Sequence, residues 1–143
     1  MEQHELSDQR RVASKLVRER FGIEYTHIEP GAATAEWTLR DGDMNVHGVP
    51  YGGILFTLAD SAAGMALGSM GGSVITISCS GSFLYGSREA RRLICHAKVR
   101  KAGNTLGFIE TEVYDDQEHL LATFQFVFGV RKDGPRKDAC ALY

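Results

Sequence analysis

The sequence predicts an α+β fold in which a curved antiparallel sheet wraps around a long central helix. Six segments alternate apolar and polar residues with the two-residue period of a β-strand. One long apolar segment, which begins at Gly52, instead has the period of a helix and stands between the second and third strand segments. Strands that are grouped along the chain and separated from their helix favour an antiparallel sheet over alternating parallel βα units.

Composition indicates one globular domain over residues 1–143. Hydrophobic residues make up 43% of the chain and charged residues 24%, which excludes a disordered chain. The net charge of -2 provides no basic field for nucleic acid, and the stretch 52–72 is too polar for a membrane span. The first residues lack the features of a signal peptide, and the three cysteines form no CxxC pair. We therefore expect a cytoplasmic protein with neither nucleic acid nor membrane as a partner.

The N-terminal helix and the first two strands have recognisable boundaries. Residues 7–21 carry one apolar stripe, which Ser7 can cap and which Gly22 can end in the C′ position. A Pro-Gly pair at residues 30–31 is typical of the turn between the two strands. The second strand alternates apolar residues, including Trp37, with polar ones, so one of its faces is expected to be buried.

The central helix is unusual because it is both apolar and thin. Its apolar residues recur at helical spacing from Gly52 to about Ser69, and alanines and glycines dominate its second half. Small side chains let the backbones of two elements approach closely. This property suits a helix that a curved sheet encloses.

Four strands follow the helix, separated by turns at residues 102–104 and 115–118. In the first of them the alternation predicts that Ile75, Ile77, Cys79 and Phe83 share one face. This order of elements is that of a hot-dog fold, whose open sheet edges predict at least a dimer. The expected elements are a helix within residues 1–21, strands at 23–28 and 33–39, a helix at 52–69, strands at 74–85, 93–99, 106–114 and 120–130, and a polar tail at 131–143.

Asp60 is the first candidate for a catalytic group. It stands in the middle of the most apolar helix, where a carboxylate is costly to bury unless it has a partner or a task. Helical spacing places it on a stripe apart from the aliphatic side of the helix, and the stripe consists of Gly53, Phe56, Thr57, Asp60 and Gly64. From spacing alone, a solvent-facing or capping role for Asp60 stays open.

Gly52 and Gly53, at the start of the same helix, are the second candidate. The first N–H groups of a helix have no carbonyl partner within it, so they can stabilise a carbonyl oxygen that becomes negative. A simple turn is the alternative. Gly52 and Asp60 are two helical turns apart, about 11 Å along the axis, which is too far for one reacting centre within a subunit. A homodimer, or a homotetramer, can bring Gly52 of one subunit to Asp60 of the other.

These residues resemble the PaaI-type hot-dog acyl-CoA thioesterases. The family pattern has an Asn, a His-Gly-Gly at the helix start and a Leu-x-Asp on the helix, which Asn45, Tyr51-Gly52-Gly53 and Asp60 resemble. The segments 76–84 and 98–105 resemble the family's third strand and a later turn. Tyr51 stands where the family usually has His. The resemblance extends over about residues 22–131.

The resemblance implies a mechanism for thioester hydrolysis. The Gly52 N–H, supported by the Asn45 amide, would polarise the carbonyl, and Asp60 of the partner subunit would activate water or attack directly. Thr76 would orient Asp60 or the water. The implied substrate is an acyl-CoA, so coenzyme A enters as part of the substrate, and neither a cofactor nor a metal is expected. The expected substrate-binding residues are Tyr51, Gly53, Phe56, His47, Arg91 and Arg92.

Arg91 and Arg92 belong to a basic segment that also contains Arg88, Lys98, Arg100 and Lys101. Arginine and lysine suit phosphate, so this segment is a candidate for the nucleotide end of coenzyme A. Ordinary surface charge is the alternative.

Two alternatives to hydrolysis also stay open. His47, which precedes Gly48-Val49-Pro50, faintly resembles the His-Phe-Pro of hot-dog dehydratases, so a hydratase or dehydratase acting on acyl thioesters is one. The other is a homologue that binds acyl-CoA without hydrolysing it, because Tyr51 stands where the family usually has His. Thiol release from a panel of acyl-CoAs, with hydration of crotonyl-CoA as the control, distinguishes the three.

Overall fold

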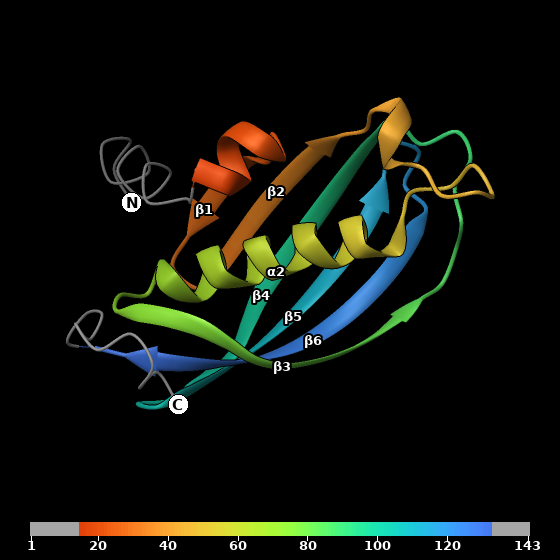
Figure 1. Cartoon of the computed structure of the whole chain (residues 1–143). Coiled ribbons are helices and arrows are strands. Elements are labelled where there is room, and N and C mark those ends of the chain that lie inside the picture. Colours follow the sequence, from red (N-terminus) through yellow and green to blue (C-terminus); the bar gives the residue numbers. More distant parts are fainter. Residues whose placement is uncertain (1–14, 133–143) are drawn as a thin grey trace.

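The computed structural model describes residues 15–132 and places helix α2 against one face of a curved sheet (Figure 1). The elements are η1 (Leu16–Arg20), β1 (Glu24–Glu29), β2 (Ala32–Thr38), η2 (Asp41–Asp43), α2 (Gly52–Gly68), β3 (Ser73–Phe83), β4 (Arg92–Ala102), β5 (Leu106–Asp115) and β6 (Leu120–Arg131). Apart from the N-terminal helix and the added η2, these bounds lie within a few residues of the expected ones.

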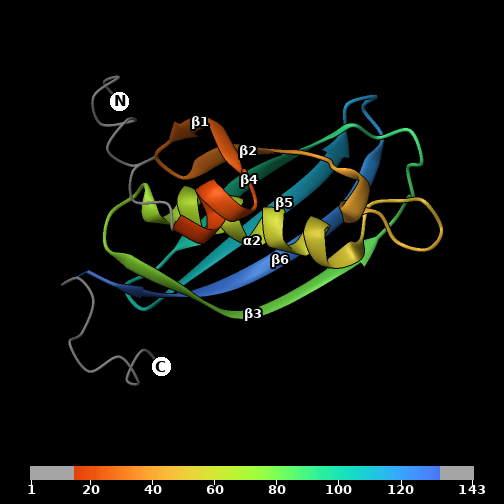
Figure 2. The same ribbon diagram turned by 45° about the horizontal axis from the view of Figure 1, so that its top comes forward.

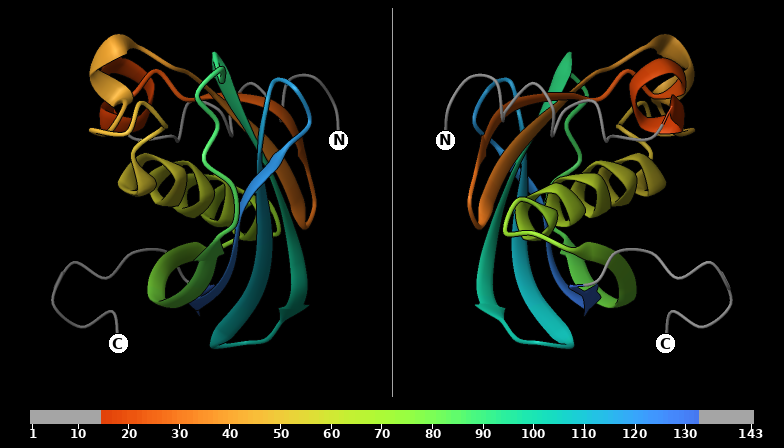
Figure 3. Two further views of the ribbon diagram at one scale, coloured as in Figure 1. Left: turned by 90° about the vertical axis from the view of Figure 1, so that its right-hand side faces the viewer. Right: turned by 90° about the vertical axis from the view of Figure 1, so that its left-hand side faces the viewer.

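The six strands form one antiparallel sheet in the order β1-β2-β4-β5-β6-β3. Strand β3 follows α2 in the chain but pairs with β6, so β1 and β3 are the two edges. Figure 2 and the side views in Figure 3 show that the strands curve around α2, which lies along the concave face. The predicted α+β hot-dog fold is confirmed.

Helix α2 packs closely on the sheet because its buried side chains are small or aliphatic. They are Leu55, Leu58, Ala59, Ala62, Ala63, Ala66 and Leu67. On the sheet side, Gly107 of β5 leaves room for this approach, because a Cβ atom there would lie 2.6 Å from Leu67 Cδ2. The opposite stripe of α2, which includes Asp60 and Gly64, is only half-buried. The helix is therefore a rigid support that presents this stripe away from the core.

Strand β3 contains a bulge that the sequence pattern did not reveal. Its pairing with β6 shifts between Thr76 and Ser78, so that Thr76 pairs with Phe128 and Cys79 pairs with Phe126. Both phenylalanines are buried in the core between sheet and helix, and their partners on β3 face the same side. The prediction that Ile75 and Cys79 share a face is therefore wrong, because the bulge adds one residue to the strand. The bulge leaves the Thr76 side chain facing α2.

The ends of the chain are only partly described. Within the expected N-terminal helix the structure describes residues 15–21, where η1 is a single π-helical turn and Gly22 has the φ of +67° expected for C′. Ser7, its expected cap, lies outside the described residues, as does the expected tail from residue 133 onward. Arg131, which the sequence places in that tail, belongs to β6. Within residues 15–132, no helix is long and apolar enough to cross a membrane.

Candidate active site

The structure gives Asp60 a partner on the neighbouring strand. The hydroxyl of Thr76 donates a hydrogen bond of 2.6 Å to Asp60 Oδ1. Thr76 can do so because the β3 bulge leaves it facing α2. Asp60 lies on that helix, eight residues after Gly52. Among residues 15–132 this is the one hydrogen bond made to the Asp60 carboxylate, so Oδ2 is available to a substrate or a water. This pairing of a carboxylate with an orienting hydroxyl suits general-base or nucleophilic chemistry.

Asp60 lines a groove of about 640 Å³ that follows the exposed stripe of α2 toward its C-terminal end. Gly64 and Gly68 form its floor on the helix, Val74 and Thr76 contribute from β3, and Phe128 contributes from β6. Apolar side chains predominate in the lining, so the Asp60 carboxylate stands at one end of a mainly apolar groove. The sequence identified Asp60 and Gly64 as parts of one stripe, and the structure places both in the same groove.

Two residues near Asp60 were missed by the sequence analysis. Tyr25 on β1 lines the groove, and its hydroxyl donates a 3.4 Å hydrogen bond to the Ser61 carbonyl. Burial raises the pKa of Tyr25, the bond to Ser61 opposes this effect, and the negative charge of Asp60 adds to it. Partial burial and then the charge of Asp60 also raise the pKa of the Cys79 thiol. A tyrosine at a buried position of a strand was the available signal for Tyr25.

The start of α2 has the geometry expected of an anion-binding helix end. Tyr51 is the N-cap residue in an extended conformation, and Gly52 and Gly53 are the first two residues of the helix. In the described part of the chain, Ile54 provides the first α2 amide that donates to a backbone carbonyl, that of Tyr51. The N–H groups of Gly52 and Gly53 are thus available to a ligand. Phe83 lies beside Gly52, because a Cβ atom there would be 3.3 Å from the Phe83 ring.

Asn45 orders the loop that leads to this helix end. Its Oδ1 atom accepts hydrogen bonds from the backbone N–H groups of His47 at 2.9 Å and Val49 at 3.3 Å. The amide NH₂ of Asn45 is not used in these bonds, which leaves two donors at the loop. The His47 side chain is exposed. Asn45 therefore has a structural role in the loop, which is compatible with the donor role implied by the resemblance.

Exposed aromatic side chains surround the helix start. Tyr51 and Phe83 are each 60% exposed, and Phe56 is 38% exposed. Phe83 and Phe56 both contact Phe124, with ring centroids 5.5 and 5.9 Å apart, so the patch is anchored in the core. Large apolar groups left exposed in this way indicate a surface that another molecule covers.

The basic segment is not one patch, because strand β4 separates its members. Arg91 and Arg92 lie at the start of β4, whereas Arg100 lies near its other end, about 25 Å away along the strand. Figure 1 shows that the start of β4 is at the same end of the molecule as the start of α2. Asp116 fixes this region, because its Oδ1 accepts hydrogen bonds from the backbone N–H groups of Arg91 and Arg92. The Arg100 side chain is paired with Glu110 at 2.6 Å.

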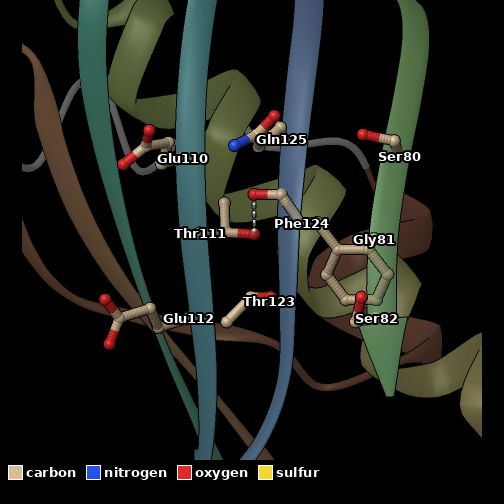
Figure 4. Close-up of a pocket in the computed structure, with 9 residues that line it drawn as sticks. All are labelled: Ser80, Gly81, Ser82, Glu110, Thr111, Glu112, Thr123, Phe124 and Gln125. Atoms are coloured by element: carbon tan, nitrogen blue, oxygen red, sulfur yellow. Dashed lines mark hydrogen bonds between the residues drawn. The ribbon is translucent and has the colours of Figure 1, made fainter. Parts of the chain in front are cut away.

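A second hollow lies on the other face of the sheet. Its volume is about 460 Å³, and Figure 4 shows its polar lining, with α2 behind the strands. Thr111 donates a 3.4 Å hydrogen bond to the Phe124 carbonyl there. No group of three His, Cys, Asp or Glu side chains suited to a metal ion occurs within residues 15–132.

Comparisons with known proteins show the family and the fold. The model of the thioesterase superfamily matches residues 47–122. The chain is 30% identical over 105 residues to the acyl-coenzyme A thioesterase PaaI of Escherichia coli (strain K12), a match that spans 73% of this chain and 75% of that protein. The solved structure of E. coli PaaI, from the phenylacetic acid degradation operon, superposes with a TM-score of 0.82 at 25% identity over 90% of this chain and 94% of that one.

A second solved structure shares the fold at lower identity. It is a protein of Streptococcus mutans UA159 bound to acetyl-CoA, with a TM-score of 0.72 at 22% identity over 77% of this chain and 89% of that one.

Proposed function

The chain belongs to the thioesterase superfamily, and on that premise we propose that it hydrolyses acyl-CoA in a site that two subunits build together. The observation that carries this proposal is the Asp60–Thr76 pair at the reacting end of an apolar groove. The acetyl-CoA bound by the related fold of Streptococcus mutans supports coenzyme A as the thiol part of the substrate.

Each group has a defined role in the proposed reaction. The Gly52 N–H, supported by the Asn45 NH₂, stabilises the negative charge that develops on the thioester oxygen. The Asp60 carboxylate takes a proton from a water that attacks the carbonyl carbon, or it attacks that carbon itself to form an anhydride that water then hydrolyses; the thiolate leaves in either case. Thr76 holds the carboxylate in place through Oδ1. A thiolate is a good leaving group, so its departure needs little help from an acid. Asp60, Gly52, Asn45 and Thr76 are thus the proposed catalytic set.

A dimer is proposed because one subunit separates the two halves of this set. Gly52 and Asp60 are about 11 Å apart along a straight helix, whereas a reacting carbonyl needs both within about 3 Å. Strand β3 is an unpaired edge next to α2, and Phe83 and Ile77 on it are exposed. Pairing of this edge with its copy across a two-fold axis covers the apolar patch and sets α2 antiparallel to its copy. Gly52 of the partner subunit then approaches Asp60.

Two variants test the proposed groups. Asp60→Asn keeps the size of the side chain and an acceptor for Thr76 while removing the negative charge. Gly52→Pro removes the proposed oxyanion N–H, and proline is well tolerated at the first position of a helix. Tyr51 already has φ -60° and ψ 132°, the conformation preferred before proline, so the backbone accepts the change. The new Cβ would lie 3.3 Å from the Phe83 ring, which must shift by a few tenths of an ångström. We expect kcat for thiol release to fall at least ~100-fold in each variant, with the oligomer intact.

Mixing the two variants tests the shared site. After subunit exchange, a mixed dimer contains one intact site, formed by Asp60 of one chain and Gly52 of the other. Statistical mixing then restores about a quarter of the wild-type activity. Mixtures that stay as inactive as the separate variants, or a monomeric mass at micromolar concentration, would refute the shared site. Near-normal turnover of folded Asp60→Asn would refute the proposed chemistry.

A further inference from the structure

The groove beside Asp60 continues well beyond the reacting carboxylate. It runs along α2 from Asp60 to Gly68, which is two further helical turns or about 11 Å. Its walls are apolar over this length, with Val17, Met65, Val74 and Phe128 facing it. Glycine at positions 64 and 68 keeps the floor open. This volume is not needed to hold the thioester itself.

The chemistry of the groove excludes the coenzyme A part of the substrate. Within residues 15–132, no lysine, arginine or histidine lines it, so it offers no partner to phosphates. The hydroxyls of Tyr25, Ser69 and Thr76 already have partners, which leaves only those of Ser61 and Ser73 for a ligand. Pantetheine carries two amides that would lose hydrogen bonds with water in such a place. An alkyl chain loses none.

We propose that this groove binds the acyl chain and that the enzyme prefers straight aliphatic chains of about eight to ten carbons, the extended length that spans ~11 Å of helix. The inference rests on the proposed function and names its substrate class. Each methylene that enters the groove leaves water for an apolar wall. The value of kcat/KM therefore rises about fourfold per methylene until the groove is full, and then levels.

The test measures thiol release from a series of acyl-CoAs with chains from two to sixteen carbons. Gly68→Leu shortens the groove at its far end, and its Cβ fits because the nearest atom, Val74 Cγ2, would lie 3.8 Å away. Gly42→Leu is the matched control, since Gly42 is exposed, lies outside the groove and has open space around a new Cβ. Melting temperatures of both variants confirm folding.

We expect Gly68→Leu to lower kcat/KM for decanoyl-CoA at least ~10-fold and to leave butyryl-CoA within about twofold of wild type. Gly42→Leu should match wild type on both substrates. A wild-type profile that is flat with chain length, or an equal loss on short and long chains in Gly68→Leu, would overturn the acyl assignment. Equal loss is also the result expected if pantetheine occupied the groove. Absence of thiol release from every acyl-CoA with the wild-type protein would instead refute the proposed function.

Discussion

Thr76→Val removes the hydroxyl that holds Asp60 and keeps the shape of the side chain. The bond lost is 2.6 Å long and ends on a carboxylate oxygen, and hydrogen bonds to charged groups contribute about 1.5–3 kcal/mol. If that energy orients the carboxylate in the transition state, its loss lowers kcat by about 10- to 150-fold, because 1.36 kcal/mol is one factor of ten. KM should change much less, since Thr76 acts through Asp60 and not on the bulk of the substrate.

The assay is steady-state thiol release from one acyl-CoA with wild type, Thr76→Val and Thr76→Ser. Thr76→Ser keeps the hydroxyl, so it should recover most of the kcat that Thr76→Val loses. A purely structural role would give the same losses in both variants, accompanied by a lower melting temperature. Thr76→Val with kcat within about twofold of wild type would refute the reasoning, because an unheld carboxylate would then be as effective as a held one.

Three further predictions concern the surroundings of the site. Tyr51→Phe should keep most activity in the thiol-release assay, because the exposed Tyr51 hydroxyl has no part in the proposed proton transfer; a loss as large as that of Asp60→Asn would contradict this. Reversing the charges of Arg91 and Arg92 should raise KM for acyl-CoA more than for an acyl-pantetheine thioester, and equal effects would leave them as plain surface charge. Asp115→Asn should lower the free energy of unfolding at pH 7 by roughly 3 kcal/mol, as measured by urea denaturation. Burial alone would raise the pKa of Asp115, but hydrogen bonds from His119, Ser87 and two backbone amides outweigh it and lower that pKa, so the difference from wild type should shrink as pH falls below about 4. A difference that is constant with pH would contradict the role of the charge.

Much of the fold could be predicted because each element carries its own local period. Helix α2 ends at Gly68, one residue before its expected end, and the six strands begin and end within three residues of the expected bounds. The bulge in β3 could not be predicted, because Ile77 looks like an ordinary member of the alternation. Its position depends on how β3 meets β6, which lies some 50 residues later in the chain.

The candidate site was predictable in its chemistry but not in its shape. The position of Asp60 on an apolar helix singled it out, and the resemblance to a known family linked it to Thr76, with which it forms a hydrogen bond. The groove was not visible in the sequence, because Val17 and Tyr25 come from elements 35 to 43 residues before Asp60. The separation of Arg91 and Arg92 from Arg100 was also missed, because residues that are close in sequence can lie far apart on a strand. Neighbours in sequence on an extended strand move apart by about 3.3 Å per residue.

The position of β3 in the sheet has a consequence for the order in which the protein is made. Strand β3 leaves the ribosome directly after α2, but its partner β6 begins at Leu120, 37 residues beyond the end of β3. At 5–20 residues per second, the segment must wait about 2–7 s with both of its edges unpaired. Thr76 can reach Asp60 in a fixed position only once β6 has docked. Enzymatic activity would then be the last property that the growing chain acquires, and a measure of complete folding.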